Sequence, residues 1–245
     1  MHRLLVLAPL AALVACTNPA GPAPGAAPAA AATTIPADDA RQAFRARGNE
    51  PGWRLDIEGG RMTFATQDGR QLATATPAAQ RTDAFTRYAV RAEGTDLTVT
   101  IFNRRCKDTM TGMPHPNVVE VVYGDRRLTG CGGDPAALLQ GPEWIVTDIA
   151  GKGMVAGSRA TLNFGADGRL AGTSSCNRYF AGYTLSGEGL TISQAGGTMM
   201  ACAPALMRQE GVFLDVLRNV RRFDVGQGGA LVLATDDGRA ITAQR

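Results

Sequence analysis

Apolar and polar residues alternate along several short segments between residues 41 and 140. The alternation is clearest at Leu97, Val99 and Ile101, which are separated by threonines. Further segments with the character of a strand lie at residues 53–57, 62–64 and 118–123. A period of two, interrupted by Asp-Gly, Glu-Gly and Gly-Asp turns, is typical of half-buried strands. The pattern therefore predicts an antiparallel, β-rich domain over residues 41–140, without a long helix.

Residues 141–245 contain similar short segments, which predict a second domain. The apolar segments lie at residues 144–148, 160–164, 185–192 and 230–234, with a last one around Ile241. Turn sequences such as Ala-Asp-Gly and Asp-Asp-Gly follow two of them, as expected for hairpins.

One segment of this second block changes to a helical period. From Pro204 the chain reads PALMRQEGVFLDVLRNVRRF, and the apolar residues that fall on one helical face are Leu206, Phe213, Val216, Leu217 and Val220. Pro204 suits a first helical turn. The basic residues near the end, where the helix dipole favours cations, are Arg218, Arg221 and Arg222. The chain is therefore predicted to be α+β, mostly antiparallel β, in two small β-rich domains.

The first sixteen residues have the features of an export signal. A basic start is followed by an apolar run from Leu4 to Ala15, which suits a signal-peptide core and is too short to span a bilayer as a helix. The sequence Leu-Val-Ala-Cys at residues 13–16 resembles the bacterial lipobox, in which a signal peptidase cuts before the cysteine. The resemblance implies a signal peptide over residues 1–15 and acyl chains, palmitate among them, on Cys16. An ordinary signal peptide followed by a chance cysteine is the alternative.

The residues after Cys16 predict a tether. Residues 16–40 are dominated by Pro, Ala and Gly and show no hydrophobic period, which is typical of a partly extended linker. In lipobox proteins an Asp directly after the cysteine favours retention in the inner membrane. Thr17 stands there instead, so the resemblance implies lipid anchoring in the outer membrane, facing the periplasm.

Composition argues against nucleic acid as a partner. The formal net charge is only +3, and the chain has 8 Phe and 2 Trp, so neither a strong basic surface nor an aromatic platform for bases is evident.

Four cysteines remain after Cys16, and an even number in an exported chain indicates disulfides. Four cysteines allow three connectivities. The two nearly equal separations place one pair in each half of the chain, which favours Cys106–Cys131 and Cys176–Cys202. On the loop-entropy model, each bridge stabilises its domain by roughly 3–4 kcal/mol.

No set of catalytic or metal-binding residues emerges from the sequence. His115 is the one histidine left after signal removal, and it lies in the rigid sequence Met-Pro-His-Pro, so we expect it in a turn or at the surface. A zinc site needs more ligands than one histidine. We therefore expect no metal, no cofactor and no catalytic residue.

Three polar candidates have structural interpretations that we prefer. Glu50 and Asp108 could form a carboxylate pair, but capping of a turn by Asp108 is the more frequent role. Asn177 is expected to form a turn and to bond to backbone. The cations at residues 104, 105 and 107 could form a basic patch, although a solvated face is expected.

Two methionine pairs, Met110 with Met113 and Met199 with Met200, could line an adaptable apolar groove. Packing in the core is the more frequent role for such residues, and we expect it here.

The second block resembles the META/HslJ family of bacterial envelope domains over about residues 142–235. The residues that carry the resemblance are Trp144, the hairpin ATLNFGADGRLAG, the segments SCNRYFAGY and TMMAC, and the helix with Glu210 and Phe213. The resemblance implies a small α+β domain with a curved antiparallel sheet and one helix, found in exported proteins and loosely linked to envelope stress. No enzymatic activity attaches to the family, and its fold is similar to secretin pilotins, which bind a lipid or a partner peptide.

The first block is similar to an uncharacterised envelope domain often found in lipoproteins. The resemblance rests on GNEPGW at residues 48–53 and on CKDTMTGMPHPNVV and GCGG within residues 106–133. It implies no function.

These observations predict a lipid-anchored protein with a non-enzymatic role, either binding of an unknown protein or peptide partner or support of the envelope under stress. Two alternatives are a lysozyme inhibitor and a pilotin-like assembly factor. A loop shaped for the cleft of lysozyme would favour the inhibitor, and an apolar groove near the helix would favour the assembly factor. An enzyme ranks last, because no nucleophile, base and orienting group can be assembled.

Overall fold

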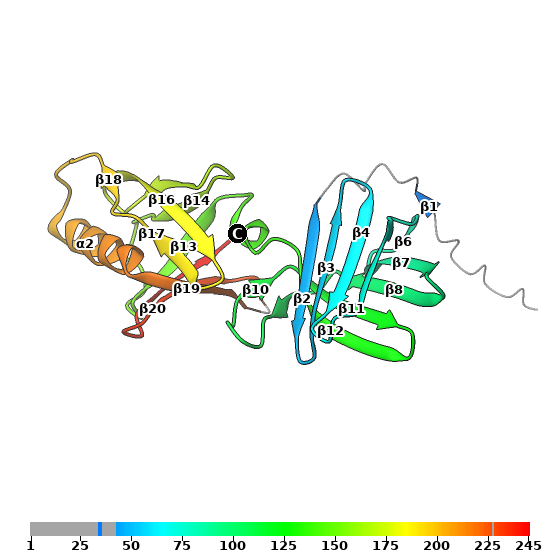
Figure 1. The fold of residues 1–245 in the computed structure, drawn as a ribbon. Coiled ribbons are helices and arrows are strands. Elements are labelled where there is room, and N and C mark those ends of the chain that lie inside the picture. The colour runs from blue at the N-terminus through cyan, green and yellow to red at the C-terminus, as the bar shows by residue number, and fades with distance from the viewer. Residues whose placement is uncertain (1–33, 36–42, 227) are drawn as a thin grey trace, which may run out of the picture. The chain divides into compact units, whose positions relative to one another are not determined.

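A computed structural model describes residues 34–35, 43–226 and 228–245 (Figure 1). The predicted signal peptide, Cys16 and the rest of the predicted tether apart from residues 34–35 lie outside the described residues. Within them, the strands form two large antiparallel sheets and a small sheet of two strands. The predicted fold class, mostly antiparallel β with one long helix, is confirmed.

The first large sheet has ten strands. In spatial order they are β1 (Thr34–Ile35), β6 (Ala79–Arg81), β7 (Phe85–Ala92), β8 (Thr95–Phe102), β11 (Asn117–Tyr123), β12 (Arg126–Gly132), β2 (Phe44–Asn49), β3 (Gly52–Glu58), β4 (Arg61–Thr66) and β5 (Gln71–Ala75). The two residues of β1 fall in the segment predicted as a tether and pair with β6.

The alternation in the sequence sets the core of this sheet. Leu97, Val99 and Ile101 of β8 are all buried. Val99 lies opposite Val121 of β11, which is buried as well, so one face of the neighbouring strands is apolar. Because successive side chains point to opposite faces, the threonines between them occupy the other face.

The sequence GNEPGW forms the turn between β2 and β3 and contains a cis Glu50–Pro51 peptide bond. The Trp53 indole donates to the carbonyl of Thr129 at 3.3 Å and lies across the backbone of two glycines. A Cβ at Gly48 would lie 2.0 Å from Trp53 Nε1, and one at Gly130 would lie 2.7 Å from its ring. The small residues therefore let the indole pack flat against the sheet.

The second large sheet has nine strands. In spatial order they are β17 (Gly189–Ile192), β16 (Arg178–Ser186), β15 (Arg169–Thr173), β14 (Thr161–Phe164), β13 (Trp144–Ile149), β21 (Ala240–Gln244), β20 (Leu231–Thr235) and β19 (Val220–Val225), and β18 (Gly196–Gly197) pairs with β16. The small sheet consists of β9 (Cys106–Lys107) and β10 (Pro114–His115).

The second sheet curves until its two edges approach each other. Gly189 of the edge strand β17 has a φ of +130°, and a Cβ there would lie 2.1 Å from the carbonyl oxygen of Arg221 in β19. Only glycine fits such an approach. The sheet is therefore nearly closed into a barrel.

The helix α2 (Pro204–Arg218) begins at the predicted proline and packs against β13, β17 and β21 (Figure 1). Its residues Phe213, Val216 and Leu217 are buried against the sheet. The predicted C-terminal end was wrong, because Val220 begins β19, where pairing with β20 replaces the helical hydrogen bonds. Arg218 is the basic residue of the last helical turn. Within the described residues, no helix is long and apolar enough to cross a membrane.

Two further differences from the prediction concern the second block. β16 begins at Arg178, earlier than the predicted strand at residue 185, because residues 178–182 pair with β15. The short helix α1 (Ala136–Leu139) lies before the predicted boundary at residue 141, yet its Leu139 is fully buried in the core of the second sheet.

Candidate binding site

Both cysteine pairs that the sequence favours are bridged in the structure. Cys106 of β9 is joined to Cys131 of β12, with 5.4 Å between their Cα atoms. Cys176 is joined to Cys202, with 6.0 Å between the Cα atoms. Because Cys202 lies just before α2, the second bridge ties the start of the helix to the turn that precedes β16.

Next to this bridge, α2 contributes a buried carboxylate. Glu210 is 9% exposed, and its Oε2 accepts hydrogen bonds from the Ser174 hydroxyl at 2.7 Å and from the backbone N–H of Asn177 at 2.8 Å. Its Oε1 accepts from the side-chain amide of Asn177 at 2.9 Å. Burial opposes ionisation, but the hydrogen bonds from Asn177 and Ser174 outweigh it and hold the pKa of Glu210 below its usual value.

Asn177 carries this network further. Its Oδ1 accepts from the Thr198 hydroxyl at 2.8 Å and from the backbone N–H of Met200 at 2.7 Å. The expected bonding of Asn177 to backbone is therefore observed. The side chain is 4% exposed and joins the carboxylate of the helix to the segment after β18.

The neighbouring Gln209 holds a second segment against the helix. Its Oε1 accepts from the backbone N–H of Val155 at 2.6 Å. Its Nε2 donates to the hydroxyls of Ser158 at 2.8 Å and Ser175 at 2.6 Å. These bonds fix the loop of residues 150–158 beside α2.

A groove of about 420 Å³ lies between this loop and α2. The helix lines it with residues spaced three or four apart, namely Ala205, Arg208, Gln209 and Val212. The loop and the end of β13 line it with Ile149, Lys152, Gly153, Met154 and Val155. This spacing defines one stripe of a helix, and the adjacent stripe buries Phe213 and Leu217 in the core. One helix therefore serves both the core and the groove.

The groove combines apolar walls with two cations. Lys152 and Arg208 are exposed, and neither forms an ion pair with another residue that the structure describes. The nearby carboxylate of Asp148 does not line the groove. Its oxygens accept from the backbone N–H groups of Gly151 at 2.8 Å and Gly153 at 2.7 Å, which shapes the loop.

Comparison with known proteins identifies the family of the part of the chain that contains the groove. A family model described as META domain matches residues 137–245. These residues form a META domain. The match begins before the predicted start at residue 141, in agreement with the burial of Leu139 in its core.

Two solved structures are similar to this part of the chain. An NMR structure of a protein from Burkholderia xenovorans is 30% identical, and the match covers 46% of this chain and 88% of that chain with a TM-score of 0.38. A second NMR structure is 24% identical, with 44% and 92% covered and a TM-score of 0.37. No curated protein matches the chain.

In the META domain, the segments that carried the family resemblance meet at Glu210. Ser174 lies directly before the segment SCNRYFAGY, which supplies Asn177. The segment TMMAC supplies Met200 and Cys202, and the helix supplies the carboxylate. The family resemblance includes Glu210 but implies no role for it. A usable signal was its spacing, because Glu210 falls on the same helical face as Phe213 and Leu217, where a charged residue needs buried partners.

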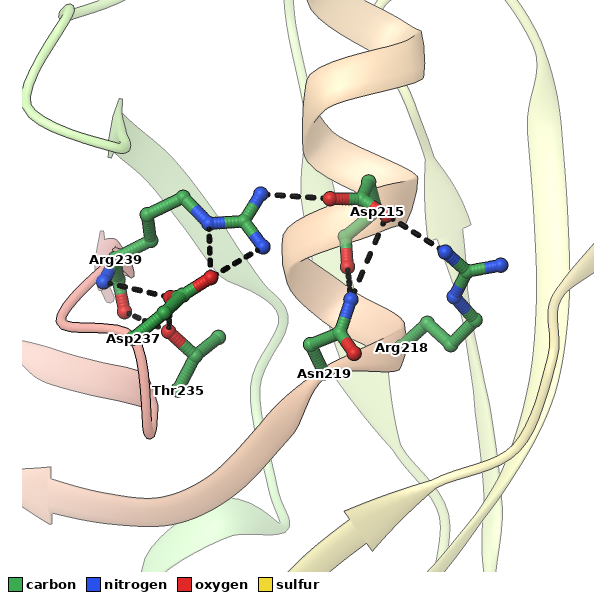
Figure 2. A network of polar contacts seen from close by, with 6 residues as sticks. All are labelled: Asp215, Arg218, Asn219, Thr235, Asp237 and Arg239. Carbon is green, nitrogen blue, oxygen red and sulfur yellow. Dashed lines mark hydrogen bonds and ion pairs between the residues drawn. The ribbon is translucent and has the colours of Figure 1, made fainter.

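The far end of the META-domain helix is held by a second polar network (Figure 2). Arg239, in the turn between β20 and β21, donates to Asp215 of α2 at 2.6 Å and to Asp237 at 2.8 Å. Asp215 also accepts from Arg218 at 2.7 Å. Arg239 holds the pKa values of Asp215 and Asp237 below their usual range. This network fixes the hairpin to the helix.

Outside the META domain, the predicted polar candidates have structural contacts. Asp108 caps its own loop by accepting from the backbone N–H groups of Met110 and Thr111, at 3.0 and 2.7 Å. It also accepts from Asn49 at 3.1 Å, whereas Glu50 is exposed and is not among the partners of Asp108 in the described residues. His115 Nδ1 lies 3.1 Å from the carbonyl oxygen of Gly133.

The cations at residues 104–107 do not act as a common patch. Arg104 lies over the ring of Phe102, Arg105 donates to the carbonyl of Gly226 at 2.7 Å, and Lys107 pairs with Asp224 at 2.8 Å. Within the described residues, no group of three or more potential metal-binding side chains occurs.

The methionines differ from the prediction. Only Met113 is buried, at 9% exposure, whereas Met110, Met199 and Met200 are 80%, 97% and 57% exposed. The expected core packing was therefore wrong for three of the four. The Thr198 hydroxyl and the backbone N–H of Met200 both donate to Asn177, and these bonds fix the backbone of the segment at the surface.

Proposed function

We propose that this protein is a lipid-anchored, periplasm-facing binding protein of the outer membrane that has no enzymatic activity. Its META domain holds a segment of a partner protein in the groove beside α2. The observation that carries the proposal is this groove, whose walls are mostly apolar and whose loop is fixed by Gln209.

The dimensions and the lining support a binding role. Ligand sites are concave, mainly apolar and largely preformed, with volumes of roughly 300–1,000 Å³ and a few polar groups that orient the ligand. The groove has about 420 Å³ and presents Met154, Val155 and Val212 as partly exposed apolar contacts. Adaptable methionine is common at surfaces that bind peptides.

The buried carboxylate next to Gln209 supports a role without catalysis. A general acid or base works best when its pKa lies near the operating pH. The pKa of Glu210 is displaced the other way, below its usual value, because hydrogen bonds from Asn177 and Ser174 outweigh its burial.

The position of the groove favours an assembly factor of the pilotin-like kind among the alternatives. An apolar groove next to the helix is the feature that separates this role from lysozyme inhibition. The inhibitor and the envelope-stress role stay predictions, and the same experiment addresses them by identifying the partner.

Site-specific photo-crosslinking in intact cells tests the proposal. A photoreactive residue replaces Val212, which lines the groove, and a second variant carries it at Glu188, in the exposed turn between β16 and β17. We expect a discrete adduct from position 212, identified by mass spectrometry, and none from position 188. Equal adducts at both positions, or none at position 212 while the protein is folded, would contradict the groove as the binding site. A lysozyme found at position 212 would favour the inhibitor.

A further inference from the structure

The groove holds two cations that no residue in the described part of the chain neutralises. Lys152 and Arg208 both line it, both are exposed, and neither is ion-paired within the described part of the chain. We propose that the bound segment carries a carboxylate beside apolar side chains, so that it places its acidic group between these cations. The inference rests on the proposed function and adds the chemical class of the ligand.

The carboxylates around the groove already accept hydrogen bonds from other groups of the protein. Asp148 accepts from the amides of its own loop, and Glu210 is turned toward Asn177 and Ser174. Asp215, one turn after Val212 on the helix, is bonded to Arg239. A rearrangement that neutralised Lys152 or Arg208 would break one of these networks, so an external anion is the favourable partner.

The form of the groove favours a peptide over an acyl chain. Met154, Val155 and Val212 remain partly exposed, so the apolar strip is open along one side. Small-molecule sites usually bury most of the ligand surface, and a bare acyl chain in an open groove would stay in contact with water. A peptide can direct apolar side chains onto the strip and keep its backbone in water.

Exposed charge pairs contribute selectivity and association rate more than affinity. The contribution of each pair is modest at ordinary salt. Reversing both cations should therefore weaken an acidic peptide by about tenfold or more, which corresponds to about 1.4 kcal/mol.

Fluorescence polarisation with labelled peptides tests the ligand class on the full-length folded protein. All peptides share the same leucines and differ in charge. One has internal glutamates and an amidated C-terminus, one has a free C-terminal carboxylate as its sole acid, and one has lysines. Laurate serves as a competitor. We expect an acidic peptide to bind at low salt, to weaken as salt rises and to exceed the lysine peptide by at least about tenfold.

The two acidic peptides separate the sources of the carboxylate, since binding of only the free-acid form assigns it to a chain terminus. Equal binding of the acidic and lysine peptides would overturn the proposal. So would displacement by laurate in the absence of any peptide preference, which would assign the groove to a fatty acid.

Charge reversal supplies the matched control. The double variant Lys152→Glu/Arg208→Glu is compared with Arg178→Glu/Arg221→Glu, which changes the same net charge at exposed cations outside the groove. Only the first should lose the acidic peptide. In cells, loss of the adduct at position 212 in the first variant alone supports the acidic ligand. An unchanged adduct would overturn the ligand class and leave the proposed function standing, whereas a wild type without an adduct would contradict the function itself.

Discussion

At the scale of single residues, Glu210 shows how a charge can be accommodated on the core side of a helix. Three donors from Ser174 and Asn177 reach its two oxygens within 2.9 Å. Unpaired, a carboxylate at this level of burial would be strongly unfavourable. The hydrogen bonds invert the effect of burial, so the ionised form is the stabilised one.

Replacement of Glu210 by glutamine should destabilise the protein by about 1–3 kcal/mol at neutral pH, because the amide nitrogen must face a donor. The carboxyl has a lowered pKa in the folded state, so its contribution is complete above the unfolded value of 4.5 and is lost as pH falls through the folded pKa. Urea unfolding at several pH values measures the free energy of unfolding of both proteins. The difference between the variant and wild type should become smaller below about pH 4.5. A constant difference would contradict the assignment, and Glu188→Gln, in an exposed turn, is the control.

Gly211 is a second informative residue, because it lies inside α2 but contributes no close contact. It is exposed, and a Cβ built on it meets no atom within 4 Å. Gly211→Ala should raise the free energy of unfolding by about 0.5–1 kcal/mol, measured by urea denaturation, because alanine loses less backbone entropy in a helix. Gly189→Ala should lower the free energy of unfolding, because the new Cβ would clash with the Arg221 carbonyl. Destabilisation by both would argue against the placement of Gly211.

At the scale of elements, α2 is fixed at both ends. The Cys176–Cys202 bridge and Glu210 hold its first half, and Asp215 with Arg239 holds its last turns (Figure 2). The residues of α2 that line the groove lie between these two fixed ends, so the geometry of the groove depends on both.

Loss of this bridge gives a prediction for the element. Cys176→Ser and Cys202→Ser should each lower the stability of the META domain by roughly 2–5 kcal/mol, and by similar amounts, because each removes the same constraint. Thermal unfolding followed by circular dichroism measures the two effects. Alkylation of the unfolded, unreduced wild type should label neither cysteine. Labelling at Cys176, or a mild effect of Cys202→Ser alone, would indicate a reactive thiol instead.

At the scale of the whole molecule, two buried apolar clusters correspond to the two large sheets. Met113, from the loop before β10, belongs to the cluster of the second sheet. Some side chains from before the predicted boundary at residue 141 therefore pack in the core of the second sheet. The sequence alone placed two of them, Leu139 and Met113, in the first block.

Anchoring is the prediction at this scale. Cys16→Ala should release the protein from membranes or leave it as an unprocessed precursor, because the predicted acyl chains would be lost. One acyl chain binds a membrane only marginally, whereas several anchor it stably. Cell fractionation followed by immunoblotting measures this, and Thr17→Asp should move the protein to the inner-membrane fraction. Wild-type protein found free in the periplasm would contradict the anchoring hypothesis.

The sequence determined the features that depend on local pattern. Alternation located β3, β4 and β8 because one face of each strand must be buried, and a dense run of β-branched residues located β11. Pro204 and the helical period located the start of α2, and the even cysteine number with matched separations favoured the two bridges. Each of these signals is readable within a short window or by counting, so no knowledge of distant contacts was needed.

Tertiary structure alone decided where the helix ends, which methionines are exposed and where the groove lies. The segment after Asn219 could extend a helix by its apolar spacing, but pairing with β20 makes it a strand. Met199 and Met200 match core residues in type, yet the bonds of Asn177 hold them at the surface. The groove depends on the contact of Val155 with Gln209, which are 54 residues apart. Such contacts join residues that are far apart in the sequence, so a pattern within a short window cannot predict them.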